Sequence, residues 1–152
     1  MHATVRSVIE VASAAHDDFC ILDTEASPEH LSRGTAQYAD ALLLVVEPYF
    51  KSLETGRRMA ALGKDLGLEH VALIANKMRD ERDLEAVTEF AESHGLEVGG
   101  IIPFDEAMPG AERAGSSPLD FAPEGLAVAA IERIARGLVD GSVAGNGATT
   151  RV

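Results

Sequence analysis

Hydrophobic residues in this chain gather in short continuous runs, separated by longer stretches of mixed polarity. Four runs stand out, at residues 19–22, 41–46, 71–75 and 98–102, of which the last is the weakest. None of them alternates between apolar and polar side chains, which is typical of parallel strands covered on both faces. The pattern therefore predicts a sheet of about four buried, parallel strands.

The stretches between these runs carry apolar residues at helical spacing. One predicted helix covers Ser52–Leu66 and ends before Gly67, and another covers Asp80–His94 and ends before Gly95. Glycine directly after a helix favours the left-handed backbone that closes it. Each of these two glycines is therefore predicted to mark a helix end.

Two further helices are expected nearer the ends of the chain. One covers residues 5–12. The other is marked by apolar residues between positions 127 and 138 and starts near Pro123. Strands that alternate with helices predict an α/β fold, a parallel sheet with flanking helices and right-handed crossovers. We expect one domain over residues 1–139, followed by a flexible tail of small residues at 140–152.

The composition fits a single globular domain and narrows its partners. The chain has 152 residues, 46% of them hydrophobic, and a formal net charge of −12 at pH 7. This acidic balance argues against nucleic-acid binding through a basic face, and equally against an anionic membrane surface. No secretory hydrophobic region occurs at the start, so we expect a cytoplasmic protein. The lone cysteine, Cys20, lies in an apolar run and is predicted to be a buried small hydrophobe.

Residues that follow the predicted strands mark the candidate site, because ligands in parallel α/β sheets bind beyond the carboxyl ends of the strands. They are Asp23, Glu47, Pro48, Asn76, Lys77, Pro103, Phe104 and Asp105. Taken alone, Asp23 is a strand-end or capping residue, although a carboxylate there can also hold the Mg²⁺ of a nucleotide. Asn76 and Lys77 alone are equally a solvated turn, and Phe104 alone is equally a core residue.

A longer phrase after the first predicted strand carries a family resemblance. It runs from Asp23 to Thr35 and contains Glu29-His30-Leu31 and Arg33-Gly34-Thr35. The phrase resembles the nucleotide-site segment of the MinD/ParA-like ATPases. It looks most like the CooC-type ATPases that help insert nickel into carbon monoxide dehydrogenase. The resemblance implies a partial MinD/ParA-like P-loop NTPase fold, ATP or ADP with Mg²⁺ as the ligand, and Asp23 on the Mg²⁺ side.

The same phrase implies a switch-like segment beside the nucleotide. Its candidate residues are Glu25, Ser27, Glu29, His30 and Arg33. Ser27 and Pro28 depart from the family pattern, which has a glycine directly after the alanine, and they restrict the backbone. Switching by this segment is therefore expected to be impaired. Acid–base or metal chemistry by His30 is the alternative to a loop-ordering role, but one histidine without convergent partners makes a poor metal site.

The residues after the third and fourth strands favour adenine over guanine. In this class of NTPases, guanine readers place an Asp two residues after the Lys, and that position here is Arg79. A guanidinium donates hydrogen bonds but cannot accept those of the guanine ring. The resemblance implies that Asn76 and Lys77 contact the base, and that Pro103, Phe104 and Asp105 lie along the adenine.

The sequence contains no glycine-rich phosphate loop with a Lys-Ser/Thr ending. In the resembled family this loop and a metal-binding Cys-x-Cys pair precede residues like those at the start of this chain. We therefore expect a CooC-like adenine-nucleotide-binding protein linked to nickel insertion, with no meaningful ATP hydrolysis and no nickel bound by this chain alone. The alternatives are a catalytically inactive protein-interaction module and a truncated half of a split ATPase.

The expected partners follow from the same resemblance. They are an N-terminal P-loop half or a second copy of the chain, together with carbon monoxide dehydrogenase. In the family the phosphate-loop strand lies between the strands that correspond to residues 19–22 and 41–46. We therefore predict an unfilled groove between these two runs. It would be closed by direct pairing, by the N-terminal segment or by another chain, because exposed strand edges recruit partners.

Overall fold

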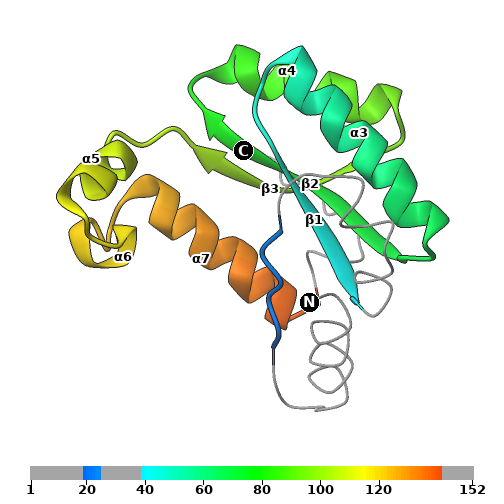
Figure 1. The fold of residues 1–152 in the computed structure, drawn as a ribbon. Coiled ribbons are helices and arrows are strands. Elements are labelled where there is room, and N and C mark those ends of the chain that lie inside the picture. Colours follow the sequence, from blue (N-terminus) through cyan, green and yellow to red (C-terminus); the bar gives the residue numbers. More distant parts are fainter. Residues whose placement is uncertain (1–18, 25–38, 142–152) are drawn as a thin grey trace.

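The computed structural model describes residues 19–24 and 39–141 (Figure 1). Its elements, in chain order, are β1 (Ala41–Val46), α3 (Phe50–Asp65), β2 (His70–Met78), α4 (Glu81–Ser93), β3 (Glu97–Pro103), α5 (Ala107–Ala114), α6 (Pro118–Phe121) and α7 (Leu126–Val139). The strands form one parallel sheet in the order β1–β2–β3. The predicted α/β fold with a parallel sheet and flanking helices is confirmed.

The sheet lies between two helical layers. Figure 1 shows α3 and α4 on one side of the sheet and α7 on the other. Two glycines let α3 approach the sheet closely, because a Cβ on Gly56 would lie 2.6 Å from Val46 Cγ1, and one on Gly63 would lie 2.8 Å from Leu42 Cδ2. A glycine inside a helix costs about 1 kcal/mol relative to alanine, so the close packing must offset that loss.

The main core lies between the sheet and the α3–α4 layer. Leu73 on the central strand is 1% exposed, and Val87 on α4 is 0% exposed. On β1 the side chains alternate, with Leu44 and Val46 buried in this core while Val45 is 62% exposed. Parallel strands are normally covered on both faces. The described residues therefore leave one face of β1 without the cover that its sequence predicts.

The predicted helix ends agree well with the structure. Helices α3 and α4 cover the predicted stretches, and the glycines that follow them, Gly67 and Gly95, have φ angles of 85° and 61°. The last helix begins at Leu126, slightly later than predicted. The short helices α5 and α6 are not among the predicted elements. None of the helices in the described ranges is both long and apolar enough to cross a membrane.

The first predicted strand requires a correction. Residues 19–24 form neither strand nor helix, and Phe19 and Ile21 are 71% and 88% exposed. Cys20, which was predicted to be buried, is exposed as well. An apolar run becomes a strand only beside a neighbour that pairs with it, and no described residue pairs with this one. The predicted helix at residues 5–12 and the tail from residue 142 onward lie outside the described residues.

Candidate functional site: the carboxyl ends of the three strands

The carboxyl ends of the strands bring most of the predicted base-side residues to one edge of the sheet. The register pairs Val46 with Ala75 across β1 and β2, and Met78 with Pro103 across β2 and β3. Glu47, which follows β1, therefore lies beside the end of β2, and Phe104 lies beside the end of β2 on the other side. This juxtaposition follows from parallel pairing alone.

Lys77 occupies an irregular position in this edge. Asn76 pairs with Ile102 and Met78 pairs with Pro103, so Lys77 is an extra residue in β2 at a shift of register. Its φ angle is 61°, and no other described non-glycine residue has a positive φ. A left-handed conformation costs a non-glycine residue roughly 1–2 kcal/mol, and such bulges re-aim a side chain.

The re-aimed side chain of Lys77 reaches back to β1. Its Nζ donates to Oε1 of Glu47 at 2.9 Å, and the two side chains are 53% and 32% exposed. The backbone N–H of Glu47 donates to Oγ of Ser52 in the first turn of α3. One lysine therefore connects the ends of two strands, and through Glu47 the start of α3.

Arg79 and Phe104 form a second connection, between β2 and β3. The Arg79 guanidinium carbon lies 4.0 Å from the centre of the Phe104 ring, a cation–π contact. The Phe104 N–H donates to the Met78 carbonyl at 2.8 Å, and the Arg79 N–H donates to Oδ2 of Asp83 at 2.9 Å. Phe104 is half-buried and so belongs to the edge of the sheet more than to its core.

Asp105 has a different environment from its neighbours. Its Oδ1 accepts from the Ala107 N–H at 2.9 Å, and its Oδ2 accepts from the Ala127 N–H at 3.1 Å. These N–H groups, Ala107 first, lower the pKa of the Asp105 carboxyl below its ordinary value, and burial opposes them only in part. The carboxylate is therefore held in its charged form by two backbone segments that lie far apart in the sequence.

Asn76 is a base-side candidate whose side-chain amide has no hydrogen-bond partner within the described part of the chain. The residue is half-buried. An amide both donates and accepts, as the edge of an adenine ring requires. The groups at this edge therefore suit a planar nucleobase: the Asn76 amide for its polar edge, and the stem of Lys77 and the Phe104 ring for its faces. Among the described residues, no three acidic, histidine or cysteine side chains gather as a metal site.

The Mg²⁺-side and switch-like candidates are placed only in part. Asp23 is exposed, and no hydrogen bond or ion pair joins it to the rest of the described chain. Glu25, Ser27, Glu29, His30 and Arg33 lie outside the described residues. Their roles remain predictions from the sequence.

The sequence analysis named Glu47, but it missed two other residues that shape this edge. They are Asp83 and Gly125. Asp83 carried a local signal, since it lies in the first turn of α4 and accepts from the Arg79 N–H four residues earlier. Gly125 gave none, since only the folded chain brings it near the Asp105 carboxylate.

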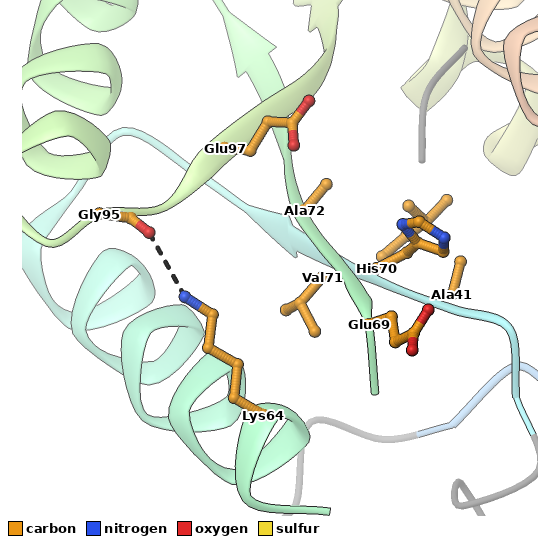
Figure 2. A pocket seen from close by; sticks show the side chains of 9 residues that line it. Ala41, Lys64, Glu69, His70, Val71, Ala72, Gly95 and Glu97 are labelled. Atoms are coloured by element: carbon orange, nitrogen blue, oxygen red, sulfur yellow. Dashed lines mark hydrogen bonds between the residues drawn. The ribbon is translucent and has the colours of Figure 1, made fainter. Parts of the chain in front are cut away.

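A cavity lies at the opposite edge of the sheet. Figure 2 shows its lining at the amino ends of the strands, with Lys64 Nζ donating to the Gly95 carbonyl at 3.4 Å. Its lining also includes the first residues of the three strands, Ala41, His70 and Glu97. None of the residues that we predict for nucleotide binding is among its lining. Because ligands in parallel sheets bind at the carboxyl ends, we place the candidate site there and not in this cavity.

The comparisons with curated proteins support the predicted resemblance. The chain is 34% identical over 139 residues to the carbon monoxide dehydrogenase accessory protein CooC of Rhodospirillum rubrum, covering 88% of this chain and 52% of CooC. It is 44% identical over 93 residues to an uncharacterized ATP-binding protein of Methanocaldococcus jannaschii, covering 60% of this chain and 36% of that protein. The chain thus spans about half or less of the length of these relatives. No family model matches it.

The solved structures agree on the fold. A ParA family ATPase from Chlorobium tepidum superposes with a TM-score of 0.76 at 26% identity, over 91% of this chain and 57% of that one. The MinC:MinD cell division complex of Aquifex aeolicus gives a TM-score of 0.75 at 21% identity, over 99% of this chain and 61% of the matched chain. The chain is therefore similar to CooC over about half of the length of CooC, and its fold is that of the MinD/ParA-type ATPases.

Proposed function

We propose that this chain provides the base-side part of an adenine-nucleotide site at the carboxyl ends of β1, β2 and β3. One observation carries the proposal: parallel pairing places Asn76, Lys77 and Phe104 at one edge, where no other described residue forms a hydrogen bond with the Asn76 amide. Pro103 ends β3, and Asp105 lies in the loop that follows it. The description of the Methanocaldococcus relative as ATP-binding supports the ligand class.

The preference for adenine rests on Arg79. Its guanidinium stacks on Phe104 and its N–H is held by Asp83, so this position offers donors where a guanine would need an acceptor. Groups that read a base edge discriminate by about 1–3 kcal/mol, which corresponds to roughly 5- to 150-fold in affinity. We therefore propose that ADP binds more tightly than GDP by a factor in this range.

The phosphate side of the site is proposed to come from elsewhere. The sequence of this chain holds no Lys-Ser/Thr phosphate loop, and a second copy would lack it too, so we propose that an N-terminal P-loop half completes the site. Asp23 would hold the Mg²⁺ of the nucleotide, since a carboxylate oxygen suits that ion. We propose carbon monoxide dehydrogenase as the partner, a link that the name of the Rhodospirillum relative supports. Nickel insertion and a cytoplasmic location are carried over from the resemblance in the sequence.

Calorimetric titration of the full chain with ADP and with GDP, each with Mg²⁺, tests the proposal. We expect weak binding that favours ADP and that weakens in Lys77→Ala. The matched control is Lys64→Ala, which removes a lysine from the cavity at the opposite edge and is expected to leave ADP binding unchanged. Equal affinity for the two nucleotides would refute the base assignment, and a loss confined to Lys64→Ala would move the site to the cavity.

A protein-interaction module is the second candidate. The exposed apolar side chains of Phe19, Ile21 and Val45 favour it, because large exposed apolar surface often marks an interaction site. Sedimentation across a range of concentrations separates the two functions. Absence of nucleotide binding together with association of the chain with itself would favour the module.

A further inference from the structure

Asp105 shares one carboxylate between the first turns of two helices. Its two oxygens accept from Ala107 in α5 and from Ala127 in α7 at 2.9 and 3.1 Å. Helix α7 has no side-chain cap of its own, because its N-cap residue is Gly125. A negative charge at the start of a helix satisfies free N–H groups and complements the helix dipole. Asp105 therefore does for α7 what a local capping residue would otherwise do.

Gly125 leaves the room that this carboxylate needs. A Cβ at Gly125 would lie 2.9 Å from Oδ2 of Asp105 and 3.0 Å from the Ala122 carbonyl oxygen. The backbone of Gly125, with φ −62° and ψ 148°, is one that alanine adopts freely. Glycine is therefore required here by space and not by conformation. A single added methyl group would press directly on the carboxylate.

The loop between β3 and α5 is consequently held at both ends. At one end the Phe104 N–H donates to the Met78 carbonyl of β2 at 2.8 Å. At the other end Asp105 fixes the loop to α7, which is itself anchored on β3, since a Cβ on Gly100 would lie 2.6 Å from Ile134 Cδ1. The Phe104 side chain leaves the loop between its own fixed N–H and Asp105, with Arg79 over its ring. The position of the ring therefore depends on the carboxylate next to it.

We propose that Asp105 is a positioning residue for base recognition: by tying the β3–α5 loop to the start of α7, it holds Phe104 and the stacked Arg79 where the base binds, and it does not itself contact the nucleotide. The role in base recognition rests on the proposed function. The positioning of the loop rests on the geometry alone. Both carboxylate oxygens accept from helix-start N–H groups, so we assign this carboxylate to the loop and not to the base edge. Gly125 contributes to the same positioning, because it leaves space for the Asp105 carboxylate.

Four variants of the full chain test this proposal. Asp105→Ala removes both acceptors, Asp105→Asn retains a single acceptor oxygen, and Gly125→Ala presses on the carboxylate. The control is Ser117→Ala, which removes the cap of α6, where Ser117 Oγ accepts from the Asp120 N–H at 3.2 Å, without touching the loop. Each variant is measured by NMR at the Phe104 ring and the Arg79 side chain, and by calorimetry with ADP and with GDP.

The expected result is a graded loss. Asp105→Ala and Gly125→Ala shift the Phe104 and Arg79 signals and weaken ADP binding by roughly 3- to 10-fold, the usual gain from fixing a side chain in its bound position. The ratio of ADP to GDP affinity falls toward one, which a general loss of stability would not cause. Asp105→Asn is intermediate, and Ser117→Ala changes neither the signals nor the ratio.

The outcomes separate the positioning from the proposed function. If the wild-type chain binds neither nucleotide but Asp105→Ala still displaces the Phe104 and Arg79 signals, the function is wrong and the positioning holds. If those signals stay unmoved in Asp105→Ala and Gly125→Ala, the positioning is overturned, whatever the nucleotide affinity. Binding of ADP with an unchanged ADP to GDP ratio in both variants overturns the role in base recognition.

Discussion

Lys77 donates to Glu47 across the carboxyl ends of β1 and β2, Nζ to Oε1 at 2.9 Å, from a backbone with a φ angle of 61°. The strained backbone and the ion pair belong together, because the extra residue in β2 turns the side chain toward β1. Strain of this kind persists only where its surroundings enforce it, and it concentrates at functional sites. The edge that we propose as the base site is therefore also where the described backbone departs most from regular geometry.

The first prediction separates the strain at Lys77 from its ion pair. Lys77→Ala and Lys77→Gly both remove the pair, but only glycine adopts the left-handed backbone without cost. Lys77→Gly should therefore be more stable to urea than Lys77→Ala by about 1 kcal/mol. Lys64 provides the control, because it lies within α3, where glycine should be the less stable by about 1 kcal/mol. Equal stability of the two Lys77 variants would show that the bulge carries no strain.

The strand and helix pattern could be predicted from the sequence because it is local. Residues 41–46 and 71–75 are continuous apolar runs, and Gly67 and Gly95 close helices by their own backbone preference. Residues 19–22 show the same local pattern, yet they form no strand, because a strand also needs a neighbour far away in the sequence. The short helix α5 contains Pro109 and few apolar residues at helical spacing, so nothing in the pattern indicated it.

The candidate site shows the same contrast between features that are local in the sequence and features that depend on distant residues. The rule that ligands bind after strand ends named Asn76, Lys77 and Phe104 from the sequence, and the structure brings these residues to one edge of the sheet. The bulge at Lys77 depends on the register between β2 and β3, which no run of residues reveals. The hydrogen bond from Ala127 to Asp105 joins residues 22 positions apart. Such contacts become visible only once the chain has folded.

The second prediction concerns acid stability. Hydrogen bonds from Arg57 and then Arg58 lower the pKa of Glu54 from 4.5 to about 2. Because the folded pKa is depressed, the stabilisation is fully present above pH 4.5 and is lost as the pH falls toward 2. Glu54→Gln should therefore lower the melting temperature at pH 7, and the difference from wild type should vanish near pH 2. A difference that stays constant across this window would show that the two arginines do not hold the carboxylate.

The third prediction tests the core. Leu73 is 1% exposed on the central strand, so Leu73→Ala should reduce the free energy of unfolding by about 2–5 kcal/mol through lost burial and the cavity left behind. Leu119→Ala is the control, because Leu119 is 68% exposed and surface changes usually stay within about 0.5 kcal/mol. Urea denaturation of the two variants gives both numbers. Similar values for both would mean that Leu73 does not lie in the folded core.

The last prediction concerns the groove beside β1. Among the described residues β1 pairs only with β2, and residues 19–22 are exposed and unpaired. In a parallel pair the N–H groups of an edge strand point alternately toward its partner and away from it. Amide exchange should therefore be fast at residues 19–22, alternate along β1 and be slow throughout β2. Adding a polypeptide that completes the sheet should slow exchange at the unprotected β1 positions. Uniform strong protection of residues 19–22 and of all of β1 in a monomer, without direct pairing between them, would mean that no groove exists.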